Sequence, residues 1–456
     1  MDVNGVPADP TADAGQLRWR QVIRGGVAGG SARMGAVAFS LVATPIAINE
    51  AGSTTYGLFA ALTSFATIMT VADFGVGNGV IRELAVTRAD PGAPDEGPII
   101  SAAAGLLVIL GLLVIAVGAL AAWVVPWQSL LRAPPGSAPQ IREAVLVVAV
   151  CTGFALPGAL AQKIYLARQQ ATRAGLLAAV ATALGSLMLM LAAYFGHHLT
   201  IMVAAQLGIP AAVGIAALLR LAASRAIYLN VRRTSFRLVK VLLKRGRLFG
   251  ALQLVAIINF EIDNLVVARI LGPNEVTVFS ATARVYAVPI VLATMFFTPL
   301  WAAFADAVAR RDMPWVSMAY RRSTRIAATG LVPLAAALAL CSGPAIRVWT
   351  DHAVHPNQTL ILALSIWLVV YAFNQPQAML LNALHAERFQ LRAAAANLVL
   401  NLTFSIIFTE QFGVSGPIWG TIVAQLACAV VPSMIYLRRV ENGSARHMPT
   451  DLPARQ

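Results

Sequence analysis

The sequence predicts an all-α integral membrane protein in which twelve transmembrane helices form two pseudo-symmetric six-helix lobes around a central cavity. Hydrophobic residues make up 58% of the chain and charged residues only 12%. Because a soluble domain carries about 25% charged residues, this composition excludes a single soluble core. Long apolar segments also recur along the chain, and each has the roughly 20 residues that a helix needs to cross a bilayer.

These apolar segments follow one another in order, separated by shorter polar stretches. The polar segment 1–21 lacks the apolar stretch of a signal peptide and predicts a disordered cytosolic tail. Segment 438–456 predicts a cytosolic tail at the other end. The expected spans are 22–48, 56–80, 99–125, 141–167, 174–195, 199–223, 249–271, 276–304, 323–341, 359–384, 391–410 and 415–437.

The basic residues predict the orientation. Lys and Arg total 34, against 20 Asp and Glu. With a cytoplasmic N-terminus, almost all basic residues fall in cytoplasmic loops, as the positive-inside rule requires. The asymmetry predicts a membrane protein with both termini cytoplasmic, and it favours anionic lipid over nucleic acid as a partner. The bacterial cytoplasmic (inner) membrane, as its location, is an expectation that the family resemblance described below adds. The exceptions on the other side are Arg132, Arg142, Arg269 and Arg347.

The longest basic loop, 224–248, divides the chain into an N-terminal lobe, 22–223, and a C-terminal lobe, 249–437. Basic residues recur at helical spacing within this loop and apolar residues lie on another face. This pattern is typical of an amphipathic helix on the inner leaflet that connects two lobes. Ordinary positive-inside charge without a special role is the alternative.

A weak internal repeat also indicates two lobes. Near the start of each half, a glycine-led turn precedes a helix that ends in an acidic residue followed by a basic one. Parallel repeats of this kind are common in transporters. We expect the charges at the ends of the two helices to lie at the cytoplasmic end and to take part in gating. The charges are Asp73 and Arg82 in the first half, and Asp306 and Arg310 in the second.

Among the charged residues of the expected spans, we single out Arg33, Glu261, Asp263 and Arg284, which lie well away from the ends of their spans. A charge at the centre of a membrane helix costs about 2.5–3.5 kcal/mol, so such groups face one another or a water-filled cavity and mark a transport path. Asp263 and Arg284 have matching depths and predict a buried pair. Arg33 lies at mid-depth with no carboxylate at that depth in its lobe, which favours binding of an anion. Pairing with an acid that only fixes helix packing is the alternative for each arginine.

Several polar side chains are less specific candidates for lining the cavity. Asn374 and Gln375 precede Pro376, which is expected to interrupt the tenth span and free backbone carbonyls, although a simple kink is the alternative. Four amide side chains are candidates either for contact with sugar hydroxyls or for hydrogen bonds between helices. They are Gln253, Asn259, Asn397 and Asn401.

Neither a metal site, a cofactor nor an enzyme activity is indicated. Cys151, Cys341 and Cys428 lie in apolar segments without the spacing of a metal or disulfide framework. No lysine follows a glycine as in a phosphate-binding loop, and no His-Glu-x-x-His motif occurs.

Two stretches carry a family resemblance. The run TPIAINEAGSTTYGLFAALTSFATIMTVADFGVGNGVIRELA, residues 44–85, resembles the opening of the bacterial polysaccharide (O-antigen type) flippases. These belong to the multidrug, oligosaccharidyl-lipid and polysaccharide exporter superfamily. The stretch from Asp263-Asn264-Leu265 through Leu271-Gly272 and Pro299-Leu300-Trp301 to Asp306 resembles the start of that family's second half.

The resemblance implies two six-helix lobes around a cavity that moves an undecaprenyl-diphosphate-linked oligosaccharide from the inner to the outer leaflet. A polysaccharide polymerase or export complex would be a further partner. Two alternatives stay open. One is a cation-coupled drug exporter of the same superfamily, and the other is a non-transporting scaffold of a polysaccharide assembly complex.

Overall fold

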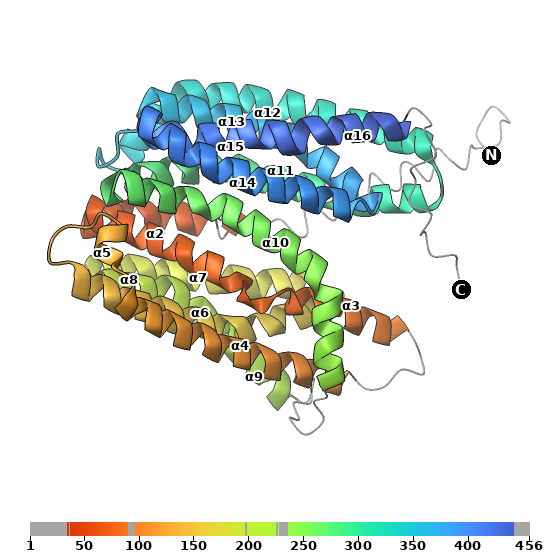
Figure 1. The fold of residues 1–456 in the computed structure, drawn as a ribbon, viewed down its shortest axis with the longest axis horizontal. Helices are drawn as coiled ribbons and strands as arrows, with labels where there is room; N and C mark the ends of the chain where they lie inside the picture. Colours follow the sequence, from red (N-terminus) through yellow and green to blue (C-terminus); the bar gives the residue numbers. More distant parts are fainter. Residues whose placement is uncertain are drawn as a thin grey trace, which may run out of the picture.

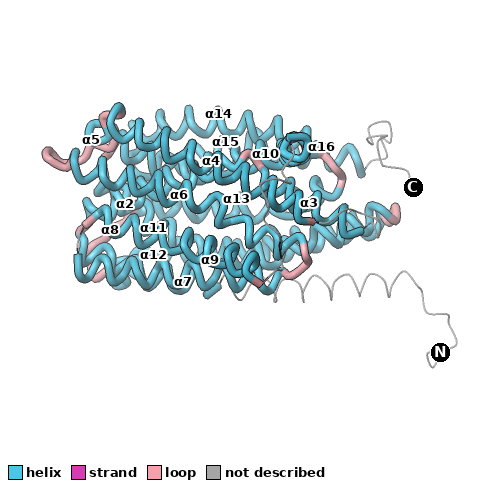
Figure 2. Tube along the Cα trace, turned by 90° about the horizontal axis from the view of Figure 1, so that it is seen from below, coloured by secondary structure: helices cyan, strands magenta, loops and turns pink. Residues whose placement is uncertain are grey.

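The computed structural model describes residues 34–35, 37–89, 96–196, 198–224, 227 and 236–441. Throughout these residues the chain forms helices joined by turns, without a strand. Most helices run nearly parallel to one another, and the chain reverses direction at the two ends of the bundle (Figure 2), whereas the first part of α10 runs across the others (Figure 1). The predicted all-α membrane fold is confirmed.

The first half of the chain contributes the helix Val37–Ala51 and the elements that follow it up to residue 223. These are α2 (Ser53–Met69), the 3₁₀ turn η1 (Thr70–Asp73), α3 (Val76–Ala89), α4 (Gly97–Val124), the short α5 (Trp127–Leu130), α6 (Ala138–Ala167), α7 (Ala171–Gly196), α8 (Leu199–Val203), the π-turn η2 (Ala204–Gly208) and α9 (Ile209–Ala223).

The second half begins with three long helices and ends in a helical pair. The elements are α10 (Phe236–Ile270), α11 (Pro273–Ala309), α12 (Met313–Trp349), α13 (Gln358–Ala383), α14 (Glu387–Phe412), the 3₁₀ turn η4 (Gly413–Ser415), α15 (Gly416–Gln425), the π-turn η5 (Leu426–Val430) and α16 (Val431–Glu441).

Ten segments of the described chain are long and apolar enough to cross a membrane. The last of them, Glu387–Val440, contains two helices, because Gly413 adopts a φ of 64° and lets the chain reverse between α14 and α15. With the shorter apolar helix Val37–Ala51, the segments agree with the predicted twelve spans.

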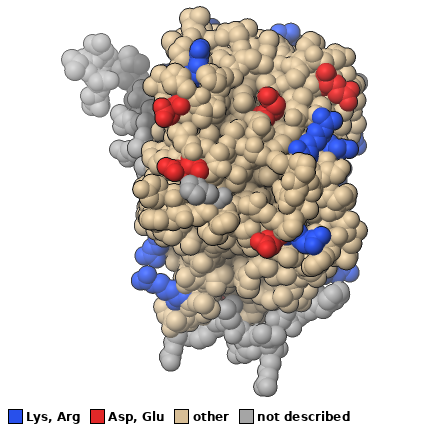
Figure 3. Space-filling model, turned by 90° about the vertical axis from the view of Figure 1, so that its left-hand side faces the viewer, with Lys and Arg blue, Asp and Glu red and all other residues tan. Residues whose placement is uncertain are grey.

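The bundle has two ends, which we name after the short elements found there. The α5 end carries the turns at Gly52 and Gly272 and the segment 125–137. The α3 end carries the end of α3 and the turns at 168–170 and 310–312. On the α5 end, acidic and basic side chains lie in small groups separated by uncharged surface (Figure 3).

The helices form two lobes, with α4 and α6–α9 in one and α11–α16 in the other (Figure 1). Helix α10 belongs to both. Leu242, near its start, is buried in a cluster with Val76 and Leu160 of the N-terminal lobe. The helix also packs against α14 and α11 of the C-terminal lobe. The helix is continuous across residue 249, so the expected end of the connecting loop does not coincide with a break in the backbone.

Two expected spans differ from their predicted form. The second is divided into α2 and α3, because Phe74 and Gly75 adopt φ values of 47° and 77° that a helix cannot accommodate. The tenth, α13, is not interrupted at Pro376, which lies inside a continuous helix. Proline lacks the backbone N–H group that would continue the hydrogen bonding of the helix, and membrane helices often accommodate a proline in this way.

Candidate substrate cavity

A cavity of about 950 Å³ opens in the C-terminal lobe. Its described lining comes from α10, α11, α13, α14 and α15–α16, and α3 adds Asn78 from the other lobe. The lining runs from Glu387, in the first turn of α14 at the α3 end, to Phe279 near the start of α11. The cavity therefore reaches the α3 end, where Glu387 lies, and extends along most of the length of the bundle.

The structure brings five of the predicted site residues together in this cavity. They come from three helices that are adjacent in the fold. Arg33, the sixth, lies outside the described residues. The five are Glu261, Asp263, Arg284, Asn374 and Gln375.

Helical spacing explains why these side chains share one space. On α13 the lining residues Trp367, Tyr371, Asn374 and Ala378 recur every three or four positions, so they lie on one face of the helix. Glu387, Gln390, Ala394 and Asn397 repeat the pattern on α14. The cavity is thus lined by one face of α13 and one face of α14, and each face mixes polar and apolar side chains.

Aromatic rings form part of the wall. The ring centroids of Phe260 and Trp367 lie 6.2 Å apart, and those of Trp367 and Tyr371 lie 5.7 Å apart. A mostly apolar wall with a few convergent polar groups is the usual composition of a small-molecule site.

Arg284 lies on the side of the cavity that faces the N-terminal lobe. Its Nη1 donates a hydrogen bond of 2.5 Å to Ser40 Oγ on the first helix. Glu261 faces Ser64 of α2 and interacts electrostatically with Arg284. Asn264 Nδ2 also donates to Ser64 Oγ, at 2.8 Å. One cation and one anion therefore meet at the contact between the lobes.

Asp263 lies in a separate polar network inside the C-terminal lobe and is only 4% exposed. Its carboxylate accepts hydrogen bonds from Ser405 Oγ at 3.4 Å and Thr421 Oγ1 at 3.2 Å. The same hydroxyl groups lie 3.0 Å from Asn401 Oδ1. Asn401 Nδ2 in turn donates to Asn259 Oδ1 at 3.2 Å, so α10, α14 and α15 are joined by one network.

The predicted pair between Asp263 and Arg284 is therefore wrong. The two residues do lie at similar depths, but residues two positions apart on a helix point in nearly opposite directions. Glu261 and Asp263 cannot both face α11, and it is Glu261 that does so. Asp263 instead faces the hydroxyl groups of α14 and α15.

The four charges predicted near the cytoplasmic end lie outside this cavity. Asp306 and Arg310 form an exposed ion pair of 2.9 Å within α11. Asp73 Oδ1 accepts the N–H of Gly75 at 2.8 Å and so stabilises the turn between α2 and α3. Arg82 is exposed on α3. Their role in gating stays a prediction.

Sequence reasoning missed Ser40, Ser405 and Thr421, the hydroxyl groups that satisfy the buried charges. Hydroxyl side chains are common in membrane helices, where most bond to their own backbone, so composition does not single these out. The four-residue spacing of Asn401 and Ser405, which places both on one face of α14, was the one available signal.

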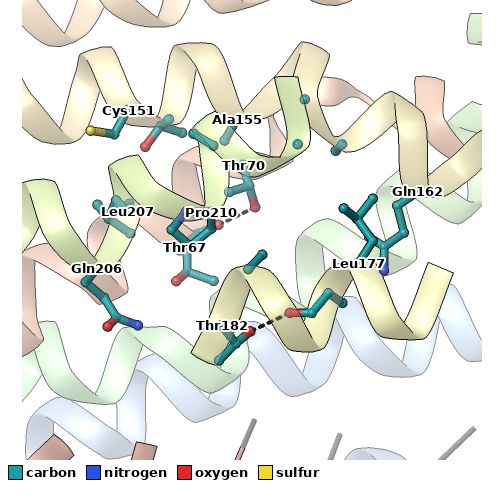
Figure 4. Close-up of a pocket in the computed structure, with 18 residues that line it drawn as sticks. Thr67, Thr70, Cys151, Ala155, Gln162, Leu177, Thr182, Gln206, Leu207 and Pro210 are labelled. Atoms are coloured by element: carbon teal, nitrogen blue, oxygen red, sulfur yellow. Dashed lines mark hydrogen bonds between the residues drawn. The ribbon is translucent and has the colours of Figure 1, made fainter. Parts of the chain in front are cut away.

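A smaller cavity of about 320 Å³ lies within the N-terminal lobe, among α2, α6, α7 and α9. Thr67, Thr182, Gln162 and Gln206 point towards it (Figure 4). Its described lining contains no charged residue. This smaller cavity therefore offers no charged side chain of the described residues to a ligand.

The architecture matches that of solved membrane transporters. The protein has the fold of the MATE family of transporters in the MOP superfamily. A structure described as the inward-facing conformation of a multidrug resistance MATE family transporter aligns with a TM-score of 0.75 and 18% identity, over 90% of this chain and 96% of that one. The outward-facing structure of such a transporter aligns with a TM-score of 0.64 and 17% identity, over 93% of this chain and 96% of that one. A MATE structure in complex with MaL6 aligns with a TM-score of 0.62 and 18% identity, over 93% of this chain and 97% of that one.

The family follows from the sequence. Residues 24–304 match the family described as "Polysaccharide biosynthesis protein". The chain belongs to this family. A search of curated proteins returns no match.

Proposed function

We propose that the protein is a flippase that moves an undecaprenyl-diphosphate-linked oligosaccharide from the inner to the outer leaflet of the bacterial inner membrane, for surface polysaccharide synthesis. The observation that carries the proposal is the cavity that holds Arg284 among amide and aromatic side chains. Family membership supports the same substrate class.

The chemistry of such a substrate matches the cavity. A sugar head group with a diphosphate cannot cross hydrocarbon unaided, so it needs a polar space with a cation while its prenyl tail stays in lipid. The planar guanidinium of Arg284 can donate two hydrogen bonds to one phosphate. Asn374 and Gln375 offer donors and acceptors for sugar hydroxyls, and Arg33 is a predicted second contact for the diphosphate.

We infer that the α3 end faces the cytoplasm, because the basic residues concentrate there. The cavity would then open inward, in keeping with the higher TM-score to the inward-facing structure. In a background without cysteine, a membrane-impermeant thiol reagent should label Ser137→Cys at the α5 end of intact cells and leave Gln169→Cys at the α3 end unlabelled. The reverse pattern would invert the orientation.

The deciding experiment replaces Arg284 in a complemented deletion strain and measures surface polysaccharide and the inner-leaflet lipid-linked intermediate at matched protein level. Loss of a charge-assisted hydrogen bond costs about 1.5–3 kcal/mol, roughly 10- to 100-fold in export. Arg284→Glu should therefore abolish export and accumulate the intermediate, whereas Arg284→Lys should retain part of it.

Two controls separate substrate binding from helix packing. Ser40→Ala removes the packing partner of Arg284 but leaves its charge, and should export nearly normally. Arg347→Ala removes an arginine of α12 outside the cavity lining. Normal export by a well-expressed Arg284→Glu variant would refute the proposal.

A cation-coupled drug exporter is the second candidate, because Glu261 and Asp263 place two carboxylates in the same cavity. Such a protein would confer resistance to cationic drugs and would leave surface polysaccharide unchanged on deletion. Neighbouring genes for glycosyltransferases would favour the flippase.

A further inference from the structure

A third cavity, of about 780 Å³, lies at the α3 end of the N-terminal lobe among α6, α7 and α9. Its described lining includes three arginines, Arg168, Arg173 and Arg220, and no Asp or Glu. We call it the arginine groove. It contains none of the residues of the candidate substrate cavity, so its role does not depend on the proposed function.

The three arginines lie at one level of the bundle. Arg168 directly follows α6, Arg173 lies in the first turn of α7, and Arg220 lies in the last turn of α9. Helix ends that leave the hydrocarbon core coincide with the level of lipid head groups. The N-terminus of α7 adds a partial positive charge at this level, whereas the C-termini of α6 and α9 add partial negative charges, so the positive charge of the groove comes from its arginines.

Away from the arginines, most of the lining is aliphatic, and part of it is exposed on the side of the lobe. Leu176 and Val180 of α7 are 60% and 42% exposed, and Val213 and Ala217 of α9 form the facing wall. Exposed aliphatic side chains on a membrane-spanning helix contact lipid tails. The groove therefore joins a cationic head to an apolar channel that opens into the bilayer.

Glu96 contacts the groove from outside its described lining. Glu96 accepts a hydrogen bond of 2.8 Å from Arg168 Nη2 and is also paired with Arg88. Burial raises the pKa of Glu96, but the hydrogen bonds and charges of Arg88 and Arg168 outweigh it and hold the pKa below its usual value. Glu96 is ionised at neutral pH and offsets part of the charge of Arg168, which leaves Arg173 and Arg220 as the main cations.

We propose that the arginine groove is a binding site for one anionic phospholipid of the bilayer, with the phosphate on Arg173 and Arg220 and an acyl chain between α7 and α9. Basic pockets between membrane helices at the cytoplasmic level suit anionic head groups. Tyr165 and Ser224 line the same end and supply hydroxyl groups for the glycerol and phosphate oxygens. A free phosphate would leave the aliphatic walls unfilled, and a zwitterionic lipid would bring its own cation to the arginines.

The test titrates the detergent-purified full-length protein with phosphatidylglycerol or phosphatidylcholine and counts bound lipid by native mass spectrometry. Each basic residue near an anionic head group contributes about 1 kcal/mol, so Arg173→Ala with Arg220→Ala should weaken phosphatidylglycerol binding roughly 30-fold. Lysine at both positions should retain most of it. Arg438→Ala with Arg439→Ala, exposed at the same end of the other lobe, should change nothing.

Further measurements distinguish a lipid phosphate from free inorganic phosphate as the ligand. Ala217→Trp fills the groove without altering charge and should also weaken phosphatidylglycerol binding, whereas inorganic phosphate in excess should not displace the lipid. Equal binding by wild type and the double alanine variant, equal affinity for phosphatidylcholine, or preferential binding of undecaprenyl phosphate to the groove would each overturn the proposal.

Discussion

At the scale of the residue, the buried carboxylate of Asp263 is stabilised by hydroxyl groups and not by a cation. Ser405 and Thr421 are its hydrogen-bond donors, and both also contact Asn401. When the partner of a buried polar group is removed, the group stays out of water without a hydrogen bond. The free-energy cost of leaving it unsatisfied is larger than the net contribution of the hydrogen bond to stability. The stability of this part of the lobe therefore depends on uncharged side chains.

Thr421→Val keeps the shape of the side chain and removes a donor to Asp263 and Asn401. We expect the free energy of unfolding to fall by about 1–3 kcal/mol, measured on the purified protein in detergent. Thr403→Val is the matched control, because Thr403 is exposed on α14 and donates only to the carbonyl of Val399 in its own helix. A loss no larger than that of the control would contradict the role of Thr421.

At the scale of the element, the lobes meet where glycines let two backbones touch. A methyl group at Gly57 of α2 would overlap the carbonyl oxygen of Pro273 on α11. At the other end, Gly75 and Gly246 face each other, and a Cβ on either would overlap the other's carbonyl oxygen. Small residues at such contacts allow close helix packing in membranes. The two lobes are thus in close contact at the α5 end, and the early part of α10 packs closely against the N-terminal lobe at the α3 end.

Gly57→Ala should separate α2 from α11. Overpacking costs about 1–3 kcal/mol, so the melting temperature in detergent should fall. Gly105→Ala on α4, where a methyl group meets nothing within 4 Å, should be neutral or stabilising by up to about 1 kcal/mol. Equal melting temperatures for the two variants would show that the α2–α11 contact does not require glycine.

At the scale of the whole molecule, polar contacts between the lobes accompany the glycines. Thr54 Oγ1 donates to Asn274 Oδ1 at 2.8 Å at the α5 end, and Asn78 Nδ2 donates to Gln253 Oε1 at 3.2 Å towards the α3 end. If transport exposes the cavity alternately to the two sides, these contacts must separate in turn.

A Thr54→Cys, Asn274→Cys variant without other cysteines should therefore lose export when a short, cleavable bifunctional thiol reagent joins the two positions. Export should return when the link is cleaved. The single-cysteine variants treated with the same reagent serve as controls and should export normally. Undiminished export by the fully cross-linked protein would exclude separation of the α5 end.

The sequence by itself determined the class of the fold and much of the cavity. Hydrophobicity and length define spans because each helix must satisfy its own backbone hydrogen bonds within lipid. The cost of a charge in the membrane likewise singles out Glu261, Asp263 and Arg284 from the sequence alone. Asn374 and Gln375 followed from their place beside a proline. All five line one cavity.

The tertiary structure alone decided which of these groups meet. Depth can be counted along a helix, but direction depends on the rotation of each helix against its neighbours, which packing fixes. The pair of Asp263 with Arg284 fails for this reason, since Asp263 points to α14 and α15 while Arg284 reaches Ser40 on the first helix. The arginine groove has the same origin, because Arg168, Arg173 and Arg220 become neighbours only when α6, α7 and α9 pack together.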